Sequence, residues 1–501
     1  MSLLTINQDW AVSINVVFNN IIEMLKYDAT NPMLFSSGLF WALFIIFIPI
    51  YSLLKSRRWQ MIIFVTAFSL FFYYKSSGLF FLLLMGTSVI DWVLSKMLSS
   101  TESRIKRKMY LSLSIILSLS VLVYFKYANF FLWNWSQMVE QNFQPLDIIL
   151  PVGISFYTFQ SIGYMVDVYK RRIAPTKTWI EYIFFLSFFP QLVAGPIVRA
   201  ENFLPQLEKN VRANATQIYA GFWLIILGIL KKALIADYIA QYNDLIFSNP
   251  TGYSGFESLM GVIGYTMQIY CDFSGYSDMA IGLALIMGFN LGKNFDFPYQ
   301  SKNISEFWRR WHISLSFWLR DYIYIPLGGN RKGTVRTYIN NLITMLIGGL
   351  WHGAAWKFVF WGGMHGVGLV IHKAASPLLK KIPDTWYVKV VSCAITLIFV
   401  SLLWVFFRAA TFTDSILIIK NIFINFDVNH IIPFIQERKV WCIMMTIIIL
   451  SHAIPRKWYD ELSNYFIKSH YLVKWIIFIV VVQLVIEFMS EDVAPFIYFQ
   501  F

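Results

Sequence analysis

Two histidines in apolar surroundings are the residues best suited to chemistry in this sequence. His352 lies in the run GGLWHGAAW at 348–356, and His312 lies in FWRRWHISLS at 307–316. An ionisable side chain at the centre of a membrane helix costs roughly 2.5 to 3.5 kcal/mol, so a functional role is the first hypothesis. A neutral imidazole can accept a hydroxyl proton while a second one orients the acyl carbonyl or that hydroxyl. The pair is sufficient for acyl transfer, although a structural hydrogen bond across helices explains His352 equally well at this stage.

Other residues near the histidines are candidates for a supporting role. Trp351 can wall a tunnel beside His352. His365 lies 13 positions beyond His352, where it would face another side if one helix ran through both, so we expect it to support packing. Asp272 and Asp278 are six positions apart, a spacing that does not pair carboxylates on a helix. Partnership with Arg or Tyr in a polar interior is therefore favoured over acid–base catalysis.

A basic cluster surrounds and follows His312. Guanidinium groups bind phosphate well, so Arg310 and its neighbours could attract the phosphates of a cytoplasmic donor. Retention of positive charge on the cytoplasmic side explains most of them equally well. The other members of the cluster are Arg309, Arg320, Arg331, Lys332 and Arg336.

Metal and nucleotide chemistry have little support in the sequence. No Cys and no H-x-x-x-H pair accompanies the histidines at the spacing of zinc ligands. The chain also lacks a P-loop, a dinucleotide fingerprint and a G-x-S-x-G motif. We therefore expect no bound metal and no bound cofactor.

The elements that must position these residues are membrane helices. The chain of 501 residues is 57% hydrophobic and only 14% charged, against about 25% charged residues in soluble proteins. Its net charge of +13 is spread over short clusters between apolar runs, which indicates membrane topology and contact with lipids instead of nucleic acid. We predict an all-α polytopic membrane protein with a single transmembrane domain over 1–501 and roughly 11 to 12 transmembrane helices.

The predicted crossings follow the apolar runs of the chain. These runs lie near 38–54, 59–74, 78–95, 110–125, 148–168, 217–240, 257–271, 276–291, 338–350, 355–372, 388–407, 440–454 and 472–490. Basic clusters at 55–58, 104–108, 170–172 and 456–457 are predicted to mark the cytoplasmic side.

Two segments are too polar or too broken to cross as ordinary helices. Prolines and a glycine interrupt 184–205, and arginines, His312 and Asp321 crowd 307–336. Such backbone is tolerated at membrane depth only where protein or a water-filled cavity surrounds it. Both segments are therefore expected to be re-entrant walls of a central tunnel.

Several long motifs in order resemble the membrane-bound O-acyltransferase superfamily, and within it the bacterial alginate O-acetyltransferase type. The motifs are PVGISFYTFQ at 151–160, GPI at 195–197, CDFSGYSD at 271–278, the segment 307–331, WHG at 351–353 and HG at 365–366. The resemblance implies that His352 and His312 are the catalytic residues on opposite sides of a constricted tunnel, within a catalytic core segment at 307–372. It also implies a multi-pass protein of the bacterial inner membrane.

The C-terminal segment 495–501 is similar to the aromatic-Tyr-aromatic motif of a small subunit used by the teichoic acid D-alanyl exporter. By that resemblance Tyr498 is an acyl relay. It would accept the group from a cytoplasmic thioester, acetyl-CoA or an acyl carrier protein, and pass it to an extracytoplasmic SGNH-type acetyltransferase. A phenol with a pKa of about 10 needs a base to become nucleophilic. An aromatic belt at the membrane interface is the simpler explanation of the same residues.

Function is thus expected to be the transfer of an acyl group, most simply acetyl, across the membrane for O-acetylation of alginate, peptidoglycan or a similar polysaccharide. A small-solute transporter is the main alternative, but the sequence shows no repeat between its halves. A lipid acyltransferase of the same superfamily is the other, and the bacterial-type motifs with the external tail weigh against it.

Overall fold

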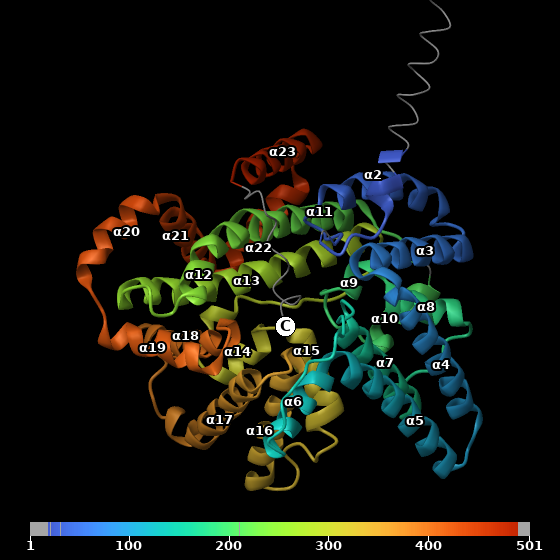
Figure 1. Cartoon of the computed structure of the whole chain (residues 1–501). Coiled ribbons are helices and arrows are strands. Elements are labelled where there is room, and N and C mark those ends of the chain that lie inside the picture. The colour runs from blue at the N-terminus through green and yellow to red at the C-terminus, as the bar shows by residue number, and fades with distance from the viewer. Residues whose placement is uncertain (1–18, 21, 31, 210, 489–501) are drawn as a thin grey trace, which may run out of the picture.

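Helices form the described part of the molecule. The structure, a computed structural model, describes residues 19–20, 22–30, 32–209 and 211–488, and no strand occurs among them (Figure 1). The first half contains α2 (Gly38–Leu54), α3 (Arg58–Ser77), α4 (Phe81–Ser100), α5 (Arg104–Leu122), α6 (Ala128–Met138), α7 (Ile154–Tyr169), α8 (Trp179–Ser187), α9 (Phe189–Leu192), α10 (Ala200–Glu208), α11 (Ala215–Ile229) and α12 (Asp237–Ser248). The second half contains α13 (Gly255–Ile286), α14 (Ile304–Arg310), α15 (Ile313–Leu319), α16 (Thr334–His352), α17 (Trp356–Leu379), α18 (Trp386–Arg408), α19 (Phe412–Ile424), α20 (Ile431–Glu437), α21 (Lys439–Ala453), α22 (Arg456–Lys468) and α23 (Tyr471–Phe488). The all-α prediction is confirmed.

Several helices begin where the sequence places a capping box. At the start of α13, Ser254 accepts from the backbone of Glu257, and the Glu257 carboxylate accepts from the Ser254 backbone. Thr411 and Asp414 form the same arrangement at the start of α19. Such reciprocal bonds satisfy amide groups that have no partner inside the helix.

The number of apolar crossings differs from the prediction. Five helical segments of the described part are long and apolar enough to cross a membrane. The number rises to seven if each of two sharply bent helix pairs is counted as one span. Helices such as α13 and α16 carry polar residues that are buried inside the protein. Length and apolarity alone therefore miss helices whose polar residues are enclosed by other helices.

The helix α13 corrects one prediction directly. The apolar runs at 257–271 and 276–291 were expected to be separate crossings, but the structure forms one helix over Gly255–Ile286. The polar residues between the runs do not break it, because Asp272 and Asp278 form ion pairs with lysines of the turn after α11. Figure 1 shows α11 and α13 lying side by side near the centre of the molecule.

The two interrupted segments form short helices, as expected from their polarity and prolines. The segment 184–205 covers the end of α8, α9 and the start of α10, and most of its side chains are buried. The segment 307–336 covers most of α14, all of α15 and a π-helical turn at Arg320–Tyr324 before α16 begins. Neither segment is a continuous crossing, and both border the histidine site.

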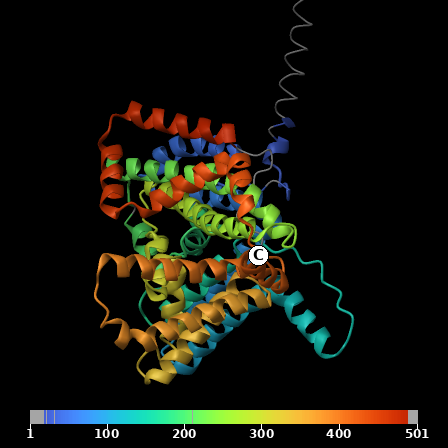
Figure 2. The same cartoon turned by 90° about the vertical axis from the view of Figure 1, so that its left-hand side faces the viewer.

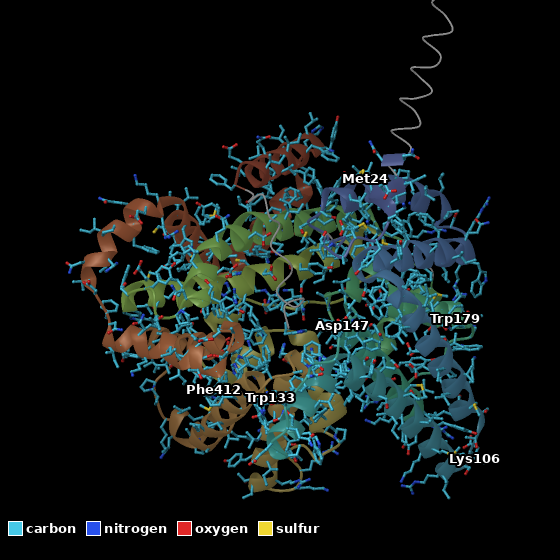
Figure 3. All side chains as sticks on the ribbon, viewed as in Figure 1. Met24, Lys106, Trp133, Asp147, Trp179 and Phe412 are labelled. Atoms are coloured by element: carbon cyan, nitrogen blue, oxygen red, sulfur yellow. The ribbon has the colours of Figure 1, made fainter. Side chains whose placement is uncertain are left out.

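One element stands apart from the helical body. Figure 2 shows α6 and the segment after it projecting away from the other helices. Residues 139–153 carry no helix or strand, and they return the chain to the start of α7. On α6, Trp133 lies beside Phe412 of α19 in Figure 3, where both line a surface groove of about 390 Å³.

Glycines bring α16 and α17 into close contact. A Cβ atom on Gly349 would lie 2.3 Å from the carbonyl oxygen of Phe358 and 3.0 Å from the Cα of Gly362. Small residues at helix contacts in membranes allow this kind of backbone approach. The contact fixes the end of α16, which carries His352, against α17.

We expect Gly349→Ala to lower both thermal stability and transfer activity. The added methyl would collide with backbone atoms of α17, and the two helices would have to move apart. Overpacking of this kind typically costs about 1–3 kcal/mol. Gly86→Ala on α4 is the matched control, since a Cβ added there would meet nothing within 4 Å and alanine is favoured in a helix. Thermal unfolding of the purified protein in detergent measures both variants; equal melting temperatures would contradict the glycine contact.

Candidate active site

His312 occupies an unusual backbone position between two short helices. It follows α14 and caps α15 in the left-handed region, with φ 42° and ψ 56°. Non-glycine residues in this region cost about 1–3 kcal/mol and persist where the surroundings demand them. The side chain is fully buried, with 0% exposed. The strained turn aims an imidazole into the protein interior from the junction of α14 and α15.

Asn294 holds the His312 ring. Its Oδ1 lies 3.2 Å from His312 Nδ1 and accepts the Ser314 hydroxyl at 2.8 Å. Its backbone carbonyl accepts from the Ile313 amide at 2.9 Å. Because an amide oxygen only accepts, this contact assigns the proton to Nδ1 and leaves the basic lone pair on Nε2. No sequence pattern pointed to Asn294, which reaches His312 only through the fold.

We expect Asn294→Ala to lower kcat about 10-fold, because the lost hydrogen bond is worth about 1.4 kcal/mol and no longer fixes the tautomer of His312. Asn421→Ala is the matched control. Asn421 is another buried amide, bonded to the Tyr253 carbonyl at 2.6 Å and the Ser258 hydroxyl at 2.9 Å. Initial transfer rates at equal amounts of folded protein measure the effect, and equal losses in both variants would assign Asn294 a structural role only.

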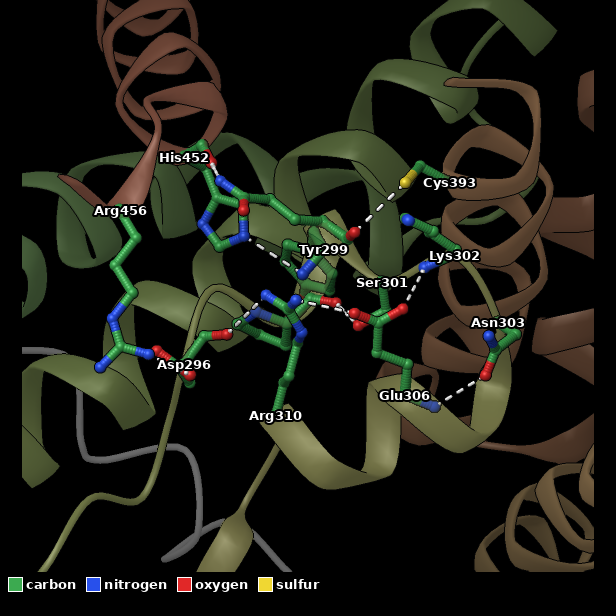
Figure 4. Close-up of polar contacts among 12 residues, drawn as sticks. Asp296, Tyr299, Ser301, Lys302, Asn303, Glu306, Arg310, Cys393, His452 and Arg456 are labelled. Atoms are coloured by element: carbon green, nitrogen blue, oxygen red, sulfur yellow. Dashed lines mark hydrogen bonds and ion pairs between the residues drawn. The ribbon is translucent and has the colours of Figure 1, made fainter. Parts of the chain in front are cut away.

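Arg310 is tied into the scaffold next to His312. Its guanidinium forms an ion pair with Glu306 at 2.7 Å and reaches the carbonyl of Asp296 at 3.4 Å, while its own carbonyl accepts from the Asp296 amide at 2.9 Å (Figure 4). The structure thus engages Arg310 within the protein, and Arg310 does not line the large cavity described below. A role in attracting a donor's phosphates is not supported by this geometry.

The same scaffold reaches the bend between α21 and α22. The backbone amide of Tyr299 donates to His452 Nε2 at 3.1 Å, and the Gln300 amide donates to the His452 carbonyl at 2.5 Å. Arg456 forms an ion pair with Asp296 at 3.1 Å (Figure 4). These contacts fix the segment that precedes His312 to a distant part of the chain.

His352 ends α16, and Trp351 joins it to His312. The His352 side chain is buried, with 3% of the residue exposed. The ring centroid of Trp351 lies 4.9 Å from that of His352 and 6.1 Å from that of His312. Phe156 and Phe159 of α7 pack on the other sides of the indole, at 5.4 and 5.3 Å. The fold therefore brings the two histidines, far apart in sequence, against one tryptophan.

His365 lies among aromatic rings on α17. Its centroid is 4.6 Å from Trp361, which is itself 5.1 Å from His352. Phe307 stacks on it at 6.1 Å, and Trp308 meets it edge-on at 5.1 Å. The expectation that His352 and His365 point apart assumed one continuous helix. Because α16 ends at His352 and α17 begins at Trp356, both imidazoles instead contact the same indole.

The two aspartates of α13 pair with lysines, not with the Arg or Tyr expected. Lys232 lies between Asp237 at 2.7 Å and Asp272 at 2.6 Å. Lys231 pairs with Asp278. Both lysines come from a π-helical turn at Leu230–Ala236, which presents adjacent residues to α13. The pairs fix the position of α13, whose Phe273 packs edge-on against His312 at 4.7 Å.

Two cavities approach the histidine pair. The larger, about 910 Å³, borders His312 through Ile313 and Ser314 and is lined by the cations Arg199, Lys293 and Arg320. The smaller, about 90 Å³, is lined by Trp351 and His352. Its remaining wall consists of Lys126, Leu150, Pro151, Val152, Gly153, Ile154, Ser155, Phe156 and Val193.

Two arginines of the predicted basic clusters lie near the large cavity. Arg58 bonds the Leu207 carbonyl at 3.3 Å, next to the cavity residue Gln206. Arg456 pairs with Asp296 at 3.1 Å, which also contacts the cavity residue Lys293 at 3.8 Å. Arg58 and Arg456, from clusters predicted to be cytoplasmic, thus each contact a residue that neighbours the lining of this cavity.

The small cavity lies at the start of α7. Ile154 at the start of this helix lines it, whereas Tyr169 at the far end accepts Arg107 of the 104–108 cluster at 2.6 Å. A helix of 16 residues extends about 24 Å at 1.5 Å per residue. The residues after His312 line the large cavity, whereas Trp351 and His352 line the small one.

The remaining sequence predictions concern the basic cluster, Tyr498 and metal binding. Of the predicted basic cluster, Arg320 lines the large cavity, joined by Arg199 and Lys293, which the sequence did not single out. Tyr498 lies outside the described residues. Among the residues that the structure describes, no group of three or more His, Cys, Asp or Glu side chains could hold a metal ion.

Comparison with known proteins agrees with this architecture. Residues 105–413 match the model of the membrane-bound O-acyltransferase family, which covers more than half of the chain and includes both histidines. The chain belongs to this family and is a multi-pass membrane acyltransferase.

Its relatives are named for the acylation of peptidoglycan, alginate or teichoic acid. The chain is 38% identical to the peptidoglycan O-acetyltransferase of Helicobacter pylori over 70% of its own length and 72% of that protein. It is 40% identical to a probable alginate O-acetylase of Pseudomonas aeruginosa over 75% of its length and 72% of that protein. A more distant relative, the teichoic acid D-alanyltransferase of Bacillus subtilis, is 28% identical over 54% of the chain and 71% of that protein.

Proposed function

We propose that this chain moves an acetyl group from a cytoplasmic thioester across the bacterial inner membrane for O-acetylation of an extracytoplasmic polysaccharide. One observation carries the proposal: His312 and His352 flank Trp351, with the large cavity next to His312 and the small cavity lined by Trp351 and His352. The names of the relatives support polysaccharide O-acetylation as the outcome. Alginate and peptidoglycan are the acceptor classes those names give.

The donor enters the large cavity in this proposal. Arg199, Lys293 and Arg320 on its wall suit the phosphates of coenzyme A or of a carrier protein's prosthetic arm. Asp321 forms ion pairs with both arginines, which holds them in place. The thioester then reaches His312 past Ser314, whose hydroxyl donates to Asn294 at 2.8 Å.

The histidines supply acid–base catalysis. His312, with its Nδ1 proton bound to Asn294, offers a basic Nε2 to the attacking hydroxyl. His352, at the small cavity, orients the acyl carbonyl, and the proton that His312 has taken from the hydroxyl passes to the leaving thiolate. Their enclosure by Trp351, Phe156 and Phe159 keeps water away from the activated acyl group.

The hydroxyl acceptor in this scheme is Tyr498. The phenyl ester formed there retains enough reactivity to pass the acetyl group to an SGNH-type acetyltransferase outside the membrane. This relay is the part of the proposal that depends on sequence resemblance.

Membrane vesicles of defined orientation test the proposed direction. Inverted vesicles, which expose the cytoplasmic face, should consume added acetyl-CoA or acetylated carrier protein, whereas right-side-out vesicles should consume neither. Equal consumption of the donor in both orientations would contradict a donor site on the cytoplasmic face.

A further inference from the structure

A lysine side chain caps the helix end that carries His352. Lys126 belongs to a π-helical turn between α5 and α6. Its ammonium donates to the carbonyl oxygens of Trp351 at 2.7 Å and of His352 at 3.1 Å. The next residue, Tyr127, donates its hydroxyl to the Leu350 carbonyl at 2.9 Å. Two adjacent residues therefore bind three successive carbonyl groups at the end of α16.

These carbonyls need partners from outside α16. The last carbonyl groups of any helix have no amide partner inside it. Gly353 is extended, with φ −163°, so α16 stops at His352 and the next helix begins only at Trp356. Leaving a buried carbonyl without a partner is costly, and a cation is favoured at a helix C-terminus. Lys126 meets both requirements from a different part of the chain.

Lys126 contacts the candidate active site as well as the end of α16. It lines the small cavity together with Trp351 and His352. Its ammonium lies 5.9 Å from the centroid of the Trp351 ring and 3.5 Å from the Ser155 hydroxyl at the start of α7. Single π-helical turns occur frequently at functional sites, and this turn presents Lys126 and Tyr127 to the same helix end.

We infer that Lys126 is a positioning residue for acyl transfer, which fixes the end of α16 and so sets the placement of the His352 imidazole beside Trp351. The inference rests on the proposed function. Lys126 acts through backbone carbonyls and does not exchange a proton with the substrate. A misplacement of about 1 Å in a reacting group can cost about 100-fold in rate, so the loss of this anchor should appear in the chemical step.

The test compares three variants in inverted membrane vesicles with acetyl-CoA as the probe. Lys126→Met keeps the apolar stem and removes the donor. Lys474→Met is the matched control, because Lys474 also binds a backbone carbonyl, that of Ser469 near the start of α23. His352→Ala reports on the proposed function itself. Rates are measured over a range of acetyl-CoA concentrations and normalised to the amount of folded protein.

We expect Lys126→Met to lower kcat between 10- and 100-fold with KM changed less than twofold, while Lys474→Met stays within twofold of the unmodified protein. If Lys126 were only structural, Lys126→Met would reduce the amount of folded protein, and the kcat of the folded fraction would not fall. A Lys126→Met kcat within threefold of the unmodified protein, beside an inactive His352→Ala, would overturn the inference alone. An unchanged rate in His352→Ala would overturn the proposed function and the inference with it.

Discussion

His352→Ala is expected to lower acetyl transfer by about 1,000-fold, the middle of the range for a positioned acid–base group. His352 is buried at the end of α16, beside Trp351 and on the wall of the small cavity. Alanine there removes the imidazole and leaves the carbonyl anchored by Lys126. Acetyl-CoA consumption by inverted vesicles measures the loss.

His470→Ala is the matched control for this variant. His470 precedes α23, is exposed, and accepts from the backbone amide of Leu472 at 3.3 Å. It should transfer acetyl groups at the rate of the unmodified protein. A His352→Ala protein that is folded, inserted and as active as His470→Ala would remove His352 from the mechanism.

Tyr498→Phe is expected to abolish the acyl-tyrosine intermediate and with it transfer to the outer side. The change keeps an aromatic ring in the C-terminal segment and removes only the hydroxyl that would carry the acyl group. Mass spectrometry of the C-terminal peptide, after incubation with a thioester donor, should find the added acetyl mass of about 42 Da in the unmodified protein only.

The outcome for Tyr498→Phe is separable from that for His352→Ala. In a His352→Ala protein with Tyr498 intact, the acyl-tyrosine should also be missing, because the transfer to the phenol needs the histidine site. Full transfer by Tyr498→Phe would mean that the acyl group passes directly from the thioester to another acceptor.

Sequence patterns predicted the positions of the helices better than the contacts between them. The apolar runs at 338–350, 355–372 and 388–407 predicted the positions of α16, α17 and α18, because a run of apolar residues is a local signal. The division of α13 into two crossings was wrong because the polar stretch that begins at Asp272 continues the same helix. The lysine partners of Asp272 and Asp278 lie on another segment of the chain, and no local pattern could reveal them.

The histidine pair could be predicted from the sequence. Of the two residues that hold it, Lys126 carried a sequence signal and Asn294 did not. Lys126 carried a signal, as an ionisable residue at the edge of an apolar run. Asn294 carried none, because a polar residue in a loop is ordinary and its contact with His312 depends on the path of the chain. The shared contact of His352 and His365 with Trp361 depends on how the chain turns between α16 and α17, which the spacing of 13 residues does not reveal.

Ester-linked acetyl groups on the envelope polysaccharides are the decisive readout for acetyl transfer by the histidine site. They would be measured in cells that lack this protein and in the same cells complemented with the unmodified chain or with His352→Ala. We predict that the esters disappear without the protein, return with the unmodified chain, and stay absent with His352→Ala at equal membrane levels. An unchanged ester content in cells that lack the protein, or full recovery with His352→Ala, would contradict the proposed function.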